Sequence, residues 1–255
     1  MVKRALIIGG SSGIGMATVK KLATTGFEID LIHRDRRQQV EMLTTELKAL
    51  RTDGKIIDTF NLDGTNPEVI KEFTQQLQSS NKEPYQLILH ALSRGNLKPF
   101  VGSDRNINSQ DLRLTIEAMG SNLHEWVMEL FSKKLLGKGC RIIALTSEGN
   151  ERMWPGYGAV GIAKSVLETL CKYLAVELAP YDVNVNIIQA GVTDTPSLRL
   201  IPEVSNLIET SIKRNPKKRL TTPEDVANVV YLLTLPEANW INGSLIHVDG
   251  GEHLI

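Results

Sequence analysis

The chain has 255 residues, 42% of them hydrophobic, which is enough to fill the core of one large α/β domain or two small ones. Lys plus Arg equals Asp plus Glu at 29 each, so no net field draws the molecule to nucleic acid or to an anionic membrane. Cys140 and Cys171 form no CxxC motif or disulfide framework, and the five histidines lack metal-ligand spacing, so we expect no bound metal.

Short apolar runs alternate with helical patterns along the whole chain. The nearly continuous apolar runs predict buried strands at RALIIG, EIDLIH, KIIDTF, YQLILHA, CRIIALT, VNVNIIQA and SLIHV. Helices are predicted at residues 13–25, 36–51, 67–80, 108–136, 158–179 and 223–235. This order predicts an α/β fold, a Rossmann-type doubly wound parallel sheet of about seven strands with helices on both faces. No linker interrupts it, so we expect a single domain over residues 1–255.

The first strand leads into a glycine-rich turn, RALIIGGSSGIGMATVKKL. The apolar run before it is too short for a signal sequence or a span of about 20 residues, so we expect a soluble cytoplasmic protein. Gly9, Gly13 and Gly15 stand where glycine allows a tight turn and lets backbone N–H groups approach a pyrophosphate. Such glycines can also serve only to pack a helix on a strand, but their place after the first strand favours nucleotide binding.

The second strand ends in LIHRDRR. An NAD enzyme usually places a carboxylate here for the ribose hydroxyls, whereas the 2′-phosphate of NADP needs a cation. His33 occupies the acidic position and Arg34 follows it, with Arg36 and Arg37 close behind. Because guanidinium groups bind phosphate with paired hydrogen bonds, the sequence favours NADPH over NADH. Arg36 and Arg37 also fit the solvent face of the next helix, more naturally than Arg34 does.

In YGAVGIAK, six residues separate Tyr157 from Lys164. On a helix the two positions share a face about 10.5 Å apart along the axis, and the lysine leans back toward the tyrosine. A nearby ammonium favours the ionised phenol, so we expect Tyr157 to be acidified. Alternatively, Lys164, Glu168 and Lys172 form a solvated ladder of charges beside a buried apolar stripe. The nucleotide loop in the same chain favours a catalytic pair.

Together these motifs resemble the short-chain dehydrogenase/reductase superfamily over almost the whole chain. GGSSGIG resembles its cofactor loop, with Ile8 in place of the usual threonine before the first glycine. Asp63 in NLDGTNPE lies where the superfamily has an aspartate beside the adenine. Asp249, Gly250 and Gly251 match its carboxyl-terminal motif.

Two departures narrow the resemblance to the enoyl-acyl carrier protein reductases. Most of the superfamily has the tyrosine four residues before the lysine, where this chain has Val160, whereas the enoyl reductases have the longer spacing of YGAVGIAK. In QAGVTDT, Ala190 replaces the usual proline, as a small residue commonly does in enoyl reductases. A frequent bacterial type carries a second tyrosine where this chain has Ser147. The chain therefore resembles the NADPH-dependent third type of Bacillus-like bacteria, as LHALSRGNLKP also does.

This resemblance implies NADPH-dependent reduction of the carbon–carbon double bond of a trans-2-enoyl thioester, on acyl carrier protein or coenzyme A, in fatty acid or related acyl-chain synthesis. It implies catalytic roles for Tyr157, Lys164 and Ser147, although Ser147 equally well caps the strand end. Asn122 is a poor match to the superfamily's helical asparagine, which leaves a proton relay through it open. The residues expected at the cofactor are Gly9, Ser11, Ser12, Gly13, Ile14, Arg34, Asp63, Leu92, Lys164, Val192 and Thr195.

A long irregular stretch, TPSLRLIPEVSNLIETSIKRNPKKRL, predicts a substrate loop at about 193–220. An apolar acyl slot is expected from Met153, Trp154, Leu198, Leu200, Ile201 and Leu207, although core packing explains some of these equally well. The basic run from Lys213 to Arg219 suits an acidic carrier protein, or is merely a solvated face. The resemblance also implies a homotetramer. The alternatives are a carbonyl or 3-ketoacyl reductase and a cofactor-binding regulator without turnover.

Overall fold

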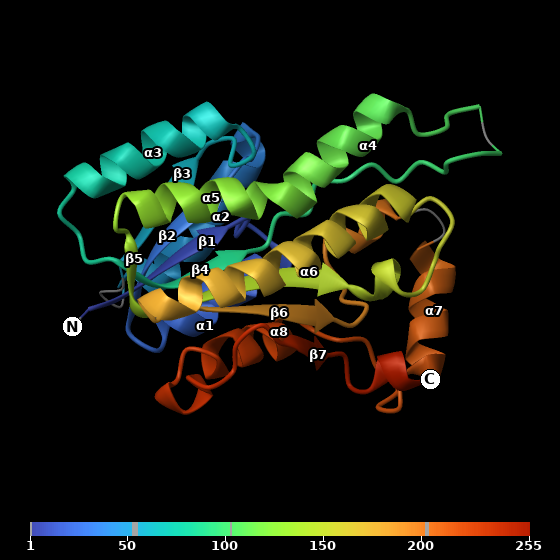
Figure 1. Cartoon of the computed structure of the whole chain (residues 1–255). Helices are drawn as coiled ribbons and strands as arrows, with labels where there is room; N and C mark the ends of the chain where they lie inside the picture. Colours follow the sequence, from blue (N-terminus) through green and yellow to red (C-terminus); the bar gives the residue numbers. More distant parts are fainter. Residues whose placement is uncertain (1, 53–55, 103, 202–203) are drawn as a thin grey trace.

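The computed structural model describes residues 2–52, 56–102, 104–201 and 204–255 (Figure 1). All the predicted strands lie in one sheet of the order β3-β2-β1-β4-β5-β6-β7, and every neighbouring pair is parallel. The strands are β1 (Lys3–Ile8), β2 (Phe27–His33), β3 (Ile57–Asn61), β4 (Tyr85–His90), β5 (Leu136–Ser147), β6 (Asn184–Ala190) and β7 (Leu245–Val248). The strand order reverses between β1 and β4, where the carboxyl ends of a doubly wound sheet leave room for a ligand.

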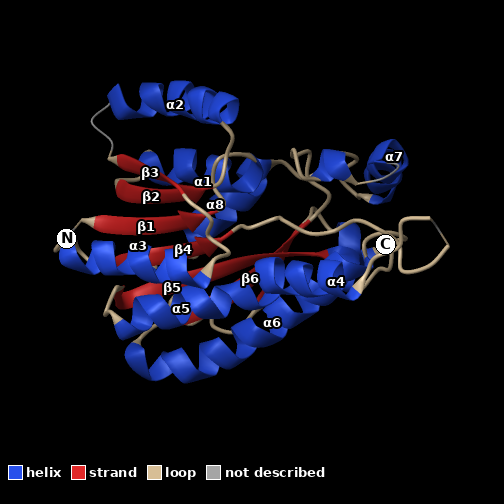
Figure 2. Ribbon diagram, turned by 90° about the horizontal axis from the view of Figure 1, so that it is seen from above, coloured by secondary structure: helices blue, strands red, loops and turns tan. Residues whose placement is uncertain are grey.

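Helices cover both faces of the sheet, as the sequence predicts (Figure 2). One face packs its buried side chains against α1, α2 and α8, and the other against α3, α5 and α6. These helices are α1 (Gly13–Ala23), α2 (Arg37–Thr52), α3 (Pro67–Ser79), α5 (Asn122–Ser132), α6 (Gly158–Leu178) and α8 (Pro223–Leu232). On the second face, the side chains of His90 and Thr146, near the carboxyl ends of β4 and β5, contact Asn122 of α5 and Glu168 of α6.

The predicted helix over 108–136 is not one continuous helix. It consists of α4 (Ser109–Ile116), a π-helical segment η1 (Glu117–Ser121) and α5. A capping box between Asn108 and Asp111 starts α4, and Lys134, with φ 57°, lies just after the end of α5. Leu136 therefore begins β5 and does not end the helix. A π-helical turn adds a residue to the helical repeat and rotates the next turns of the helix, and such turns are common at functional sites.

The predicted loop at 193–220 contains helices that the sequence analysis missed. These are η4 (Leu198–Leu200) and α7 (Val204–Arg214), and residues 202–203 of the loop lie outside the described residues. Both α4 and α7 project beyond the carboxyl ends of the strands (Figures 1 and 2). The remaining short helices are η2 (Glu148–Asn150), η3 (Ala179–Tyr181), η5 (Pro236–Ala238) and η6 (Glu252–Leu254).

A buried charged cluster joins the strands away from the site. Arg4 near the start of β1 forms an ion pair with Asp30 of β2, and its guanidinium lies 4.5 Å from the ring centroid of Tyr85 of β4. The Tyr85 hydroxyl also donates to Asp30. Each buried charge therefore has a partner, which its burial requires. None of the described helices is both long enough and apolar enough to cross a membrane.

Candidate active site

A cavity of about 790 Å³ opens at the carboxyl ends of the strands. Its walls are the turn after β1, the ends of β2 and β3, the segment after β4, the end of β5, the start of α6 and the loop after β6. Every residue expected at the cofactor lines it, from Gly9 of the first turn to Thr195 of the last loop. Within the described residues, no three His, Cys, Asp or Glu side chains come together as metal ligands.

The glycine turn leaves backbone exposed to one end of this cavity. Gly9 has φ 91°, and a Cβ there would lie 2.8 Å from the carbonyl oxygen of Ala91. A Cβ on Gly15 would lie 2.4 Å from the carbonyl oxygen of Gly9, so only glycine lets α1 start this close to β1. The side chain of Ser12, the N-cap of α1, makes no capping hydrogen bond. The first N–H groups of α1 can thus receive a pyrophosphate, and the turn fits a dinucleotide cofactor.

Positive and negative side chains meet at the β2 and β3 end of the cavity. Asp63 Oδ2 lies 2.5 Å from Arg34 Nη1 and 3.6 Å from Arg94 Nη1. Burial alone would raise the pKa of Asp63, but hydrogen bonds from Thr65 and the charges of both arginines lower it overall. Arg36 lines the cavity as well. Sequence reasoning missed Arg94, which only the fold brings beside Asp63.

The segment after Arg34 lies partly in the cavity and partly in solvent. Asp35 lines the cavity, and its Oδ2 lies 2.9 Å from the Nδ1 of buried His33. Asn61 holds the backbone of Asp35, because its amide accepts from Asp35 N at 3.1 Å and donates to Asp35 O at 3.0 Å. Arg37, in contrast, extends into solvent and pairs with Glu41.

Tyr157 and Ser147 meet at the opposite end of the cavity. Tyr157 stands at the N-cap of α6, and its hydroxyl lies 3.1 Å from Ser147 Oγ at the end of β5. A Cβ on Gly149 would lie 2.3 Å from Tyr157 Cε1, so the ring rests directly on the η2 backbone. Burial raises the pKa of Tyr157, and the Ser147 hydrogen bond lowers it by less. The phenol therefore stays protonated at neutral pH.

Lys164 is buried, 6% exposed, and its Nζ donates to the carbonyl oxygen of Leu145 at 2.8 Å. Burial lowers its pKa to about 8, against the opposing influence of Cys171 and Glu168. The prediction that this ammonium lowers the pKa of Tyr157 is wrong. The ammonium donates to the β5 backbone, and burial has the largest effect on the pKa of the phenol, which it raises.

The solvated ladder of charges on α6 is also absent. Glu168 is buried, and its Oε1 accepts from Thr146 Oγ1 at 2.6 Å and from Asn150 Nδ2 at 2.8 Å. Of the ladder's three members only Lys172 is exposed. Lys164 and Glu168 thus belong to the interior beneath the cavity, and Glu168 ties α6 to β5 and η2.

The apolar end of the cavity is lined by most of the residues expected there. These are Trp154, Leu198, Leu200, Ile201 and Leu207. The prediction for Met153 is wrong: it is 73% exposed and does not line the cavity. The neighbouring Trp154 takes the inward place, with its ring centroid 6.0 Å from that of Tyr157 in an edge-on contact.

The basic run between Lys213 and Arg219 is not uniformly exposed. Arg214 Nη2 lies 2.5 Å from Glu148 Oε2 and 2.7 Å from Glu252 Oε1, in a largely buried double ion pair. Arg214 is therefore unavailable to a partner and holds the end of α7 against η2 and η6. Lys213, Lys217, Lys218 and Arg219 remain exposed.

Sequence reasoning missed a polar chain beside Lys164. His90 is fully buried, and its Nε2 lies 3.2 Å from Asn122 Oδ1. The Asn122 Nδ2 donates to the carbonyl oxygen of Gly64 at 3.0 Å. The sequence analysis named Asn122 only as a poor match to the superfamily's helical asparagine, and it gave no sign that His90 is its partner.

Comparisons with known proteins agree with this geometry. A family profile described as enoyl-(acyl carrier protein) reductase matches residues 9–253. The NADH enoyl-acyl-carrier-protein reductase FabI of Enterococcus faecalis is 34% identical over 167 residues, 66% of each chain. FabI of Bacillus subtilis, also named for NADH, is 30% identical over 66% of this chain and 64% of its own length. The match thus spans just under two thirds of these two relatives.

Two other similar proteins match over nearly all of this chain. The 1-cyclohexenylcarbonyl-CoA reductase of Streptomyces collinus is 27% identical over 98% of this chain and 87% of its own. A crystal structure of the NADH enoyl-acyl-carrier-protein reductase of Aquifex aeolicus superposes with a TM-score of 0.87 at 25% identity, covering 99% of this chain and 97% of that one.

Proposed function

This chain belongs to the enoyl-(acyl carrier protein) reductase family, and on that premise we propose that it reduces the carbon–carbon double bond of a trans-2-enoyl thioester with NADPH. The observation that carries the proposal is the protonated Tyr157 hydroxyl beside Ser147 Oγ, between a glycine turn suited to a dinucleotide and an apolar end suited to an acyl chain. The Streptomyces relative, named as a reductase of an unsaturated acyl-CoA, supports this class of substrate.

NADPH held in the cavity would supply the hydride for the β-carbon, and solvent would supply the proton for the α-carbon. Negative charge develops on the thioester oxygen as the hydride adds. Tyr157 donates a hydrogen bond to this oxygen, which stabilises the developing enolate as an oxyanion hole does. Its raised pKa suits this role, because the phenol remains a donor at neutral pH. Ser147 orients the phenol through the 3.1 Å contact, and Lys164, which lines the cavity, would hold the cofactor ribose.

The assay for this reaction compares two substrates. Oxidation of NADPH is expected with crotonyl thioester but not with acetoacetyl thioester, because the proposal places hydride transfer at a carbon–carbon double bond. Loss of NADPH absorbance with each substrate measures this. The opposite preference would identify a ketoacyl reductase, and cofactor binding without oxidation on either would identify a non-catalytic protein.

Replacing Tyr157 with Phe removes the donor and keeps the ring that packs on Gly149. We expect kcat with crotonyl thioester to fall more than about tenfold, which is over about 1.4 kcal/mol of barrier, with the thermal midpoint nearly unchanged. Tyr181→Phe, at an exposed position outside the cavity, is the matched control and should retain full activity. A Tyr157→Phe enzyme with normal kcat would remove the phenol from the mechanism.

The coenzyme preference rests on the cations at the β2 end of the cavity. Arg34, Arg36 and Arg94 all line it, and paired guanidinium hydrogen bonds suit a 2′-phosphate. Asp35 and Asp63 line the same region, and carboxylates suit the ribose hydroxyls of NADH. We propose NADPH because Arg34 is anchored by Asp63 at the cavity edge. This assignment departs from the two FabI relatives named for NADH and agrees with the resemblance to the third, Bacillus-like type of enoyl reductase.

Replacing Arg34 with Ala tests the preference. We expect KM for NADPH to rise about tenfold, because a charge-assisted hydrogen bond contributes about 1.5–3 kcal/mol, while KM for NADH stays within about twofold. Arg37→Ala, at a position outside the cavity, is the control. An equal rise for both coenzymes would contradict the 2′-phosphate contact.

The proposed physiological substrate is an acyl group on acyl carrier protein. The exposed cations Lys213, Lys217 and Lys218 lie at and just after the end of α7, beside the cavity wall, and would attract an acidic carrier. Coenzyme A is the alternative carrier. These lysines lie near the apolar end of the cavity, because Arg214 in their midst pairs with Glu148 of the cavity wall.

Reversing the charge of Lys217 tests whether it affects docking of the carrier protein without affecting the reduction itself. With Lys217→Glu we expect KM for crotonyl acyl carrier protein to rise about fivefold, since rim charges act mainly on encounter, while KM for uncharged crotonyl pantetheine stays unchanged. Lys48→Glu, exposed on α2, is the control. Equal KM values for wild type and variant on the carrier-bound substrate would discard this docking surface.

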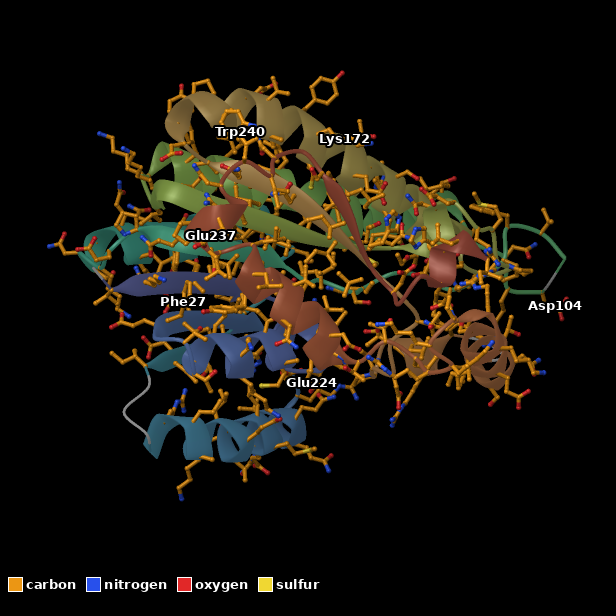
Figure 3. All side chains as sticks on the ribbon, turned by 90° about the horizontal axis from the view of Figure 1, so that it is seen from below. Phe27, Asp104, Lys172, Glu224, Glu237 and Trp240 are labelled. Carbon is orange, nitrogen blue, oxygen red and sulfur yellow. The ribbon has the colours of Figure 1, made fainter. Side chains whose placement is uncertain are left out.

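We also propose a homotetramer, as the family resemblance implies. Large apolar side chains are exposed on α6, where Tyr173 is 66% and Val176 is 74% exposed. On the loop before β7, Trp240 is 97% exposed and is labelled in Figure 3. A contiguous apolar patch on a surface is typical of contact with another chain, and we propose that these side chains belong to such a contact.

Light scattering measures the assembly directly. We expect a mass about four times the 28.2 kDa of one chain, and a smaller mass for Val176→Glu, because a charge in an apolar interface is costly. A wild-type mass of a single chain would refute the tetramer.

A further inference from the structure

His90 and Lys164 lie beneath the same two helices. His90 ends β4 and pairs with Ala144 of β5. Lys164 reaches from α6 to the carbonyl oxygen of Leu145, the residue after Ala144. Ala144 packs in the core cluster that contains α5 and α6 residues, so the His90 side chain, on the same side of the sheet, shares the interior that holds the ammonium.

The hydrogen bonds around Asn122 determine the state of the His90 ring. Because Asn122 Nδ2 donates to the carbonyl oxygen of Gly64, its Oδ1 is the acceptor that faces His90 Nε2. Nε2 must therefore carry a hydrogen, and in the neutral ring Nδ1 is then an acceptor. Burial first, and then the charge of Lys164, lower the pKa of His90 to about 4, so the ring is neutral near pH 7.

The Nδ1 atom of His90 is buried and makes no hydrogen bond within the part of the chain that the structure describes. A buried acceptor without a donor costs about 1–3 kcal/mol. The Lys164 ammonium has three donors, and the carbonyl oxygen of Leu145 takes one of them. The same interior thus contains His90 Nδ1, an acceptor without a donor, and the Lys164 ammonium, which has two further N–H donors.

The other groups around Lys164 do not compete for this role. On α6, Glu168 accepts through Oε1 from Thr146 and Asn150; its charge raises the pKa of Lys164, but it makes no hydrogen bond to the ammonium. The Cys171 thiol is uncharged, because burial raises its pKa to about 12. Tyr157 at the start of α6 is paired with Ser147. On β5 the carbonyl oxygen of Leu145 accepts a hydrogen bond from the ammonium, and on β4 the titratable side chain on this side of the sheet near Lys164 is His90.

We propose that His90 is a positioning residue for Lys164: its Nδ1 accepts a hydrogen bond from the ammonium, directly or through one water molecule, and so keeps that group charged and in place to bind the cofactor. Through Asn122, the same ring links Lys164 to the Gly64 backbone at the far end of the cavity. The inference rests on the nucleotide binding in the proposed function, and it does not depend on which thioester is reduced.

Two substitutions separate the two nitrogens of the ring. In His90→Asn the amide oxygen can take the place of Nδ1, whereas in His90→Gln the amide nitrogen can take the place of Nε2 and donate to Asn122. The readout is the affinity for NADPH from pH 6 to 10, measured by the fluorescence of the reduced cofactor. In the wild type, affinity should fall as Lys164 loses its proton at a pKa of about 8.

His90→Asn should keep this alkaline midpoint, and His90→Gln should move it down by about one pH unit, because an ammonium that lacks an acceptor loses its proton more readily. In the assay, His90→Gln should raise KM for NADPH and leave KM for the thioester unchanged. Binding needs no thioester, so a protein that reduces none still tests the inference. The proposal would be overturned if the alkaline midpoint moved in His90→Asn but not in His90→Gln, moved equally in both variants, or moved in neither.

The wild-type protein provides a second measurement that does not depend on the variants folding. Long-range proton–nitrogen NMR spectra report which ring nitrogen of His90 carries hydrogen. We expect hydrogen on Nε2 and a bare Nδ1 from pH 5.5 to 9. Hydrogen on Nδ1, or a doubly protonated ring in this range, would overturn the proposal even if Lys164 proves essential.

Discussion

The burial of one ammonium group, that of Lys164, governs the arrangement of the site. A charge removed from water costs several kcal/mol unless polar groups receive it. The carbonyl oxygen of Leu145 does so from the end of β5, with Glu168 one helical turn along α6. These contacts place the start of α6 over the carboxyl end of the sheet. Because its pKa is about 8, the group is still mostly charged at neutral pH.

The same helix holds the hydroxyl groups of Tyr157 and Ser147 in place through neutral and acidic partners. Glu168 binds Thr146 before Ser147 and Asn150 after it, so the segment between them has little freedom. Gly149 within that segment supports the ring of Tyr157. The 3.1 Å contact between the two hydroxyls is therefore a consequence of α6 packing on β5. Arg214 joins α7 to this segment through Glu148, which fixes one end of the helix that covers the apolar part of the cavity.

The two ends of the cavity differ in how rigidly they are built. The end that contains Tyr157 and Lys164 is made of buried and half-buried side chains joined by hydrogen bonds. At the end near β2 and β3, Arg34, Arg94 and Asp63 lie at the surface, where ion pairs contribute little to stability. Coenzyme preference can therefore change within a family without disturbing the fold. This is a physical reason why a chain with a cationic rim can belong to the same family as two FabI proteins named for NADH.

The sequence by itself determined the fold class, all seven strands, the glycine turn and the candidate pair Tyr157 and Lys164, because apolar runs, glycines and helical spacing are local signals. Only the tertiary structure decided that Lys164 turns to Leu145, that Arg214 is buried between two glutamates, and that Met153 faces solvent. The sequence also gave no prediction of the contact between His90 and Asn122, or of the π-helical turn just before Asn122. Such outcomes depend on which distant segments pack together and on the cost of burying their polar atoms, and no spacing along the chain encodes either.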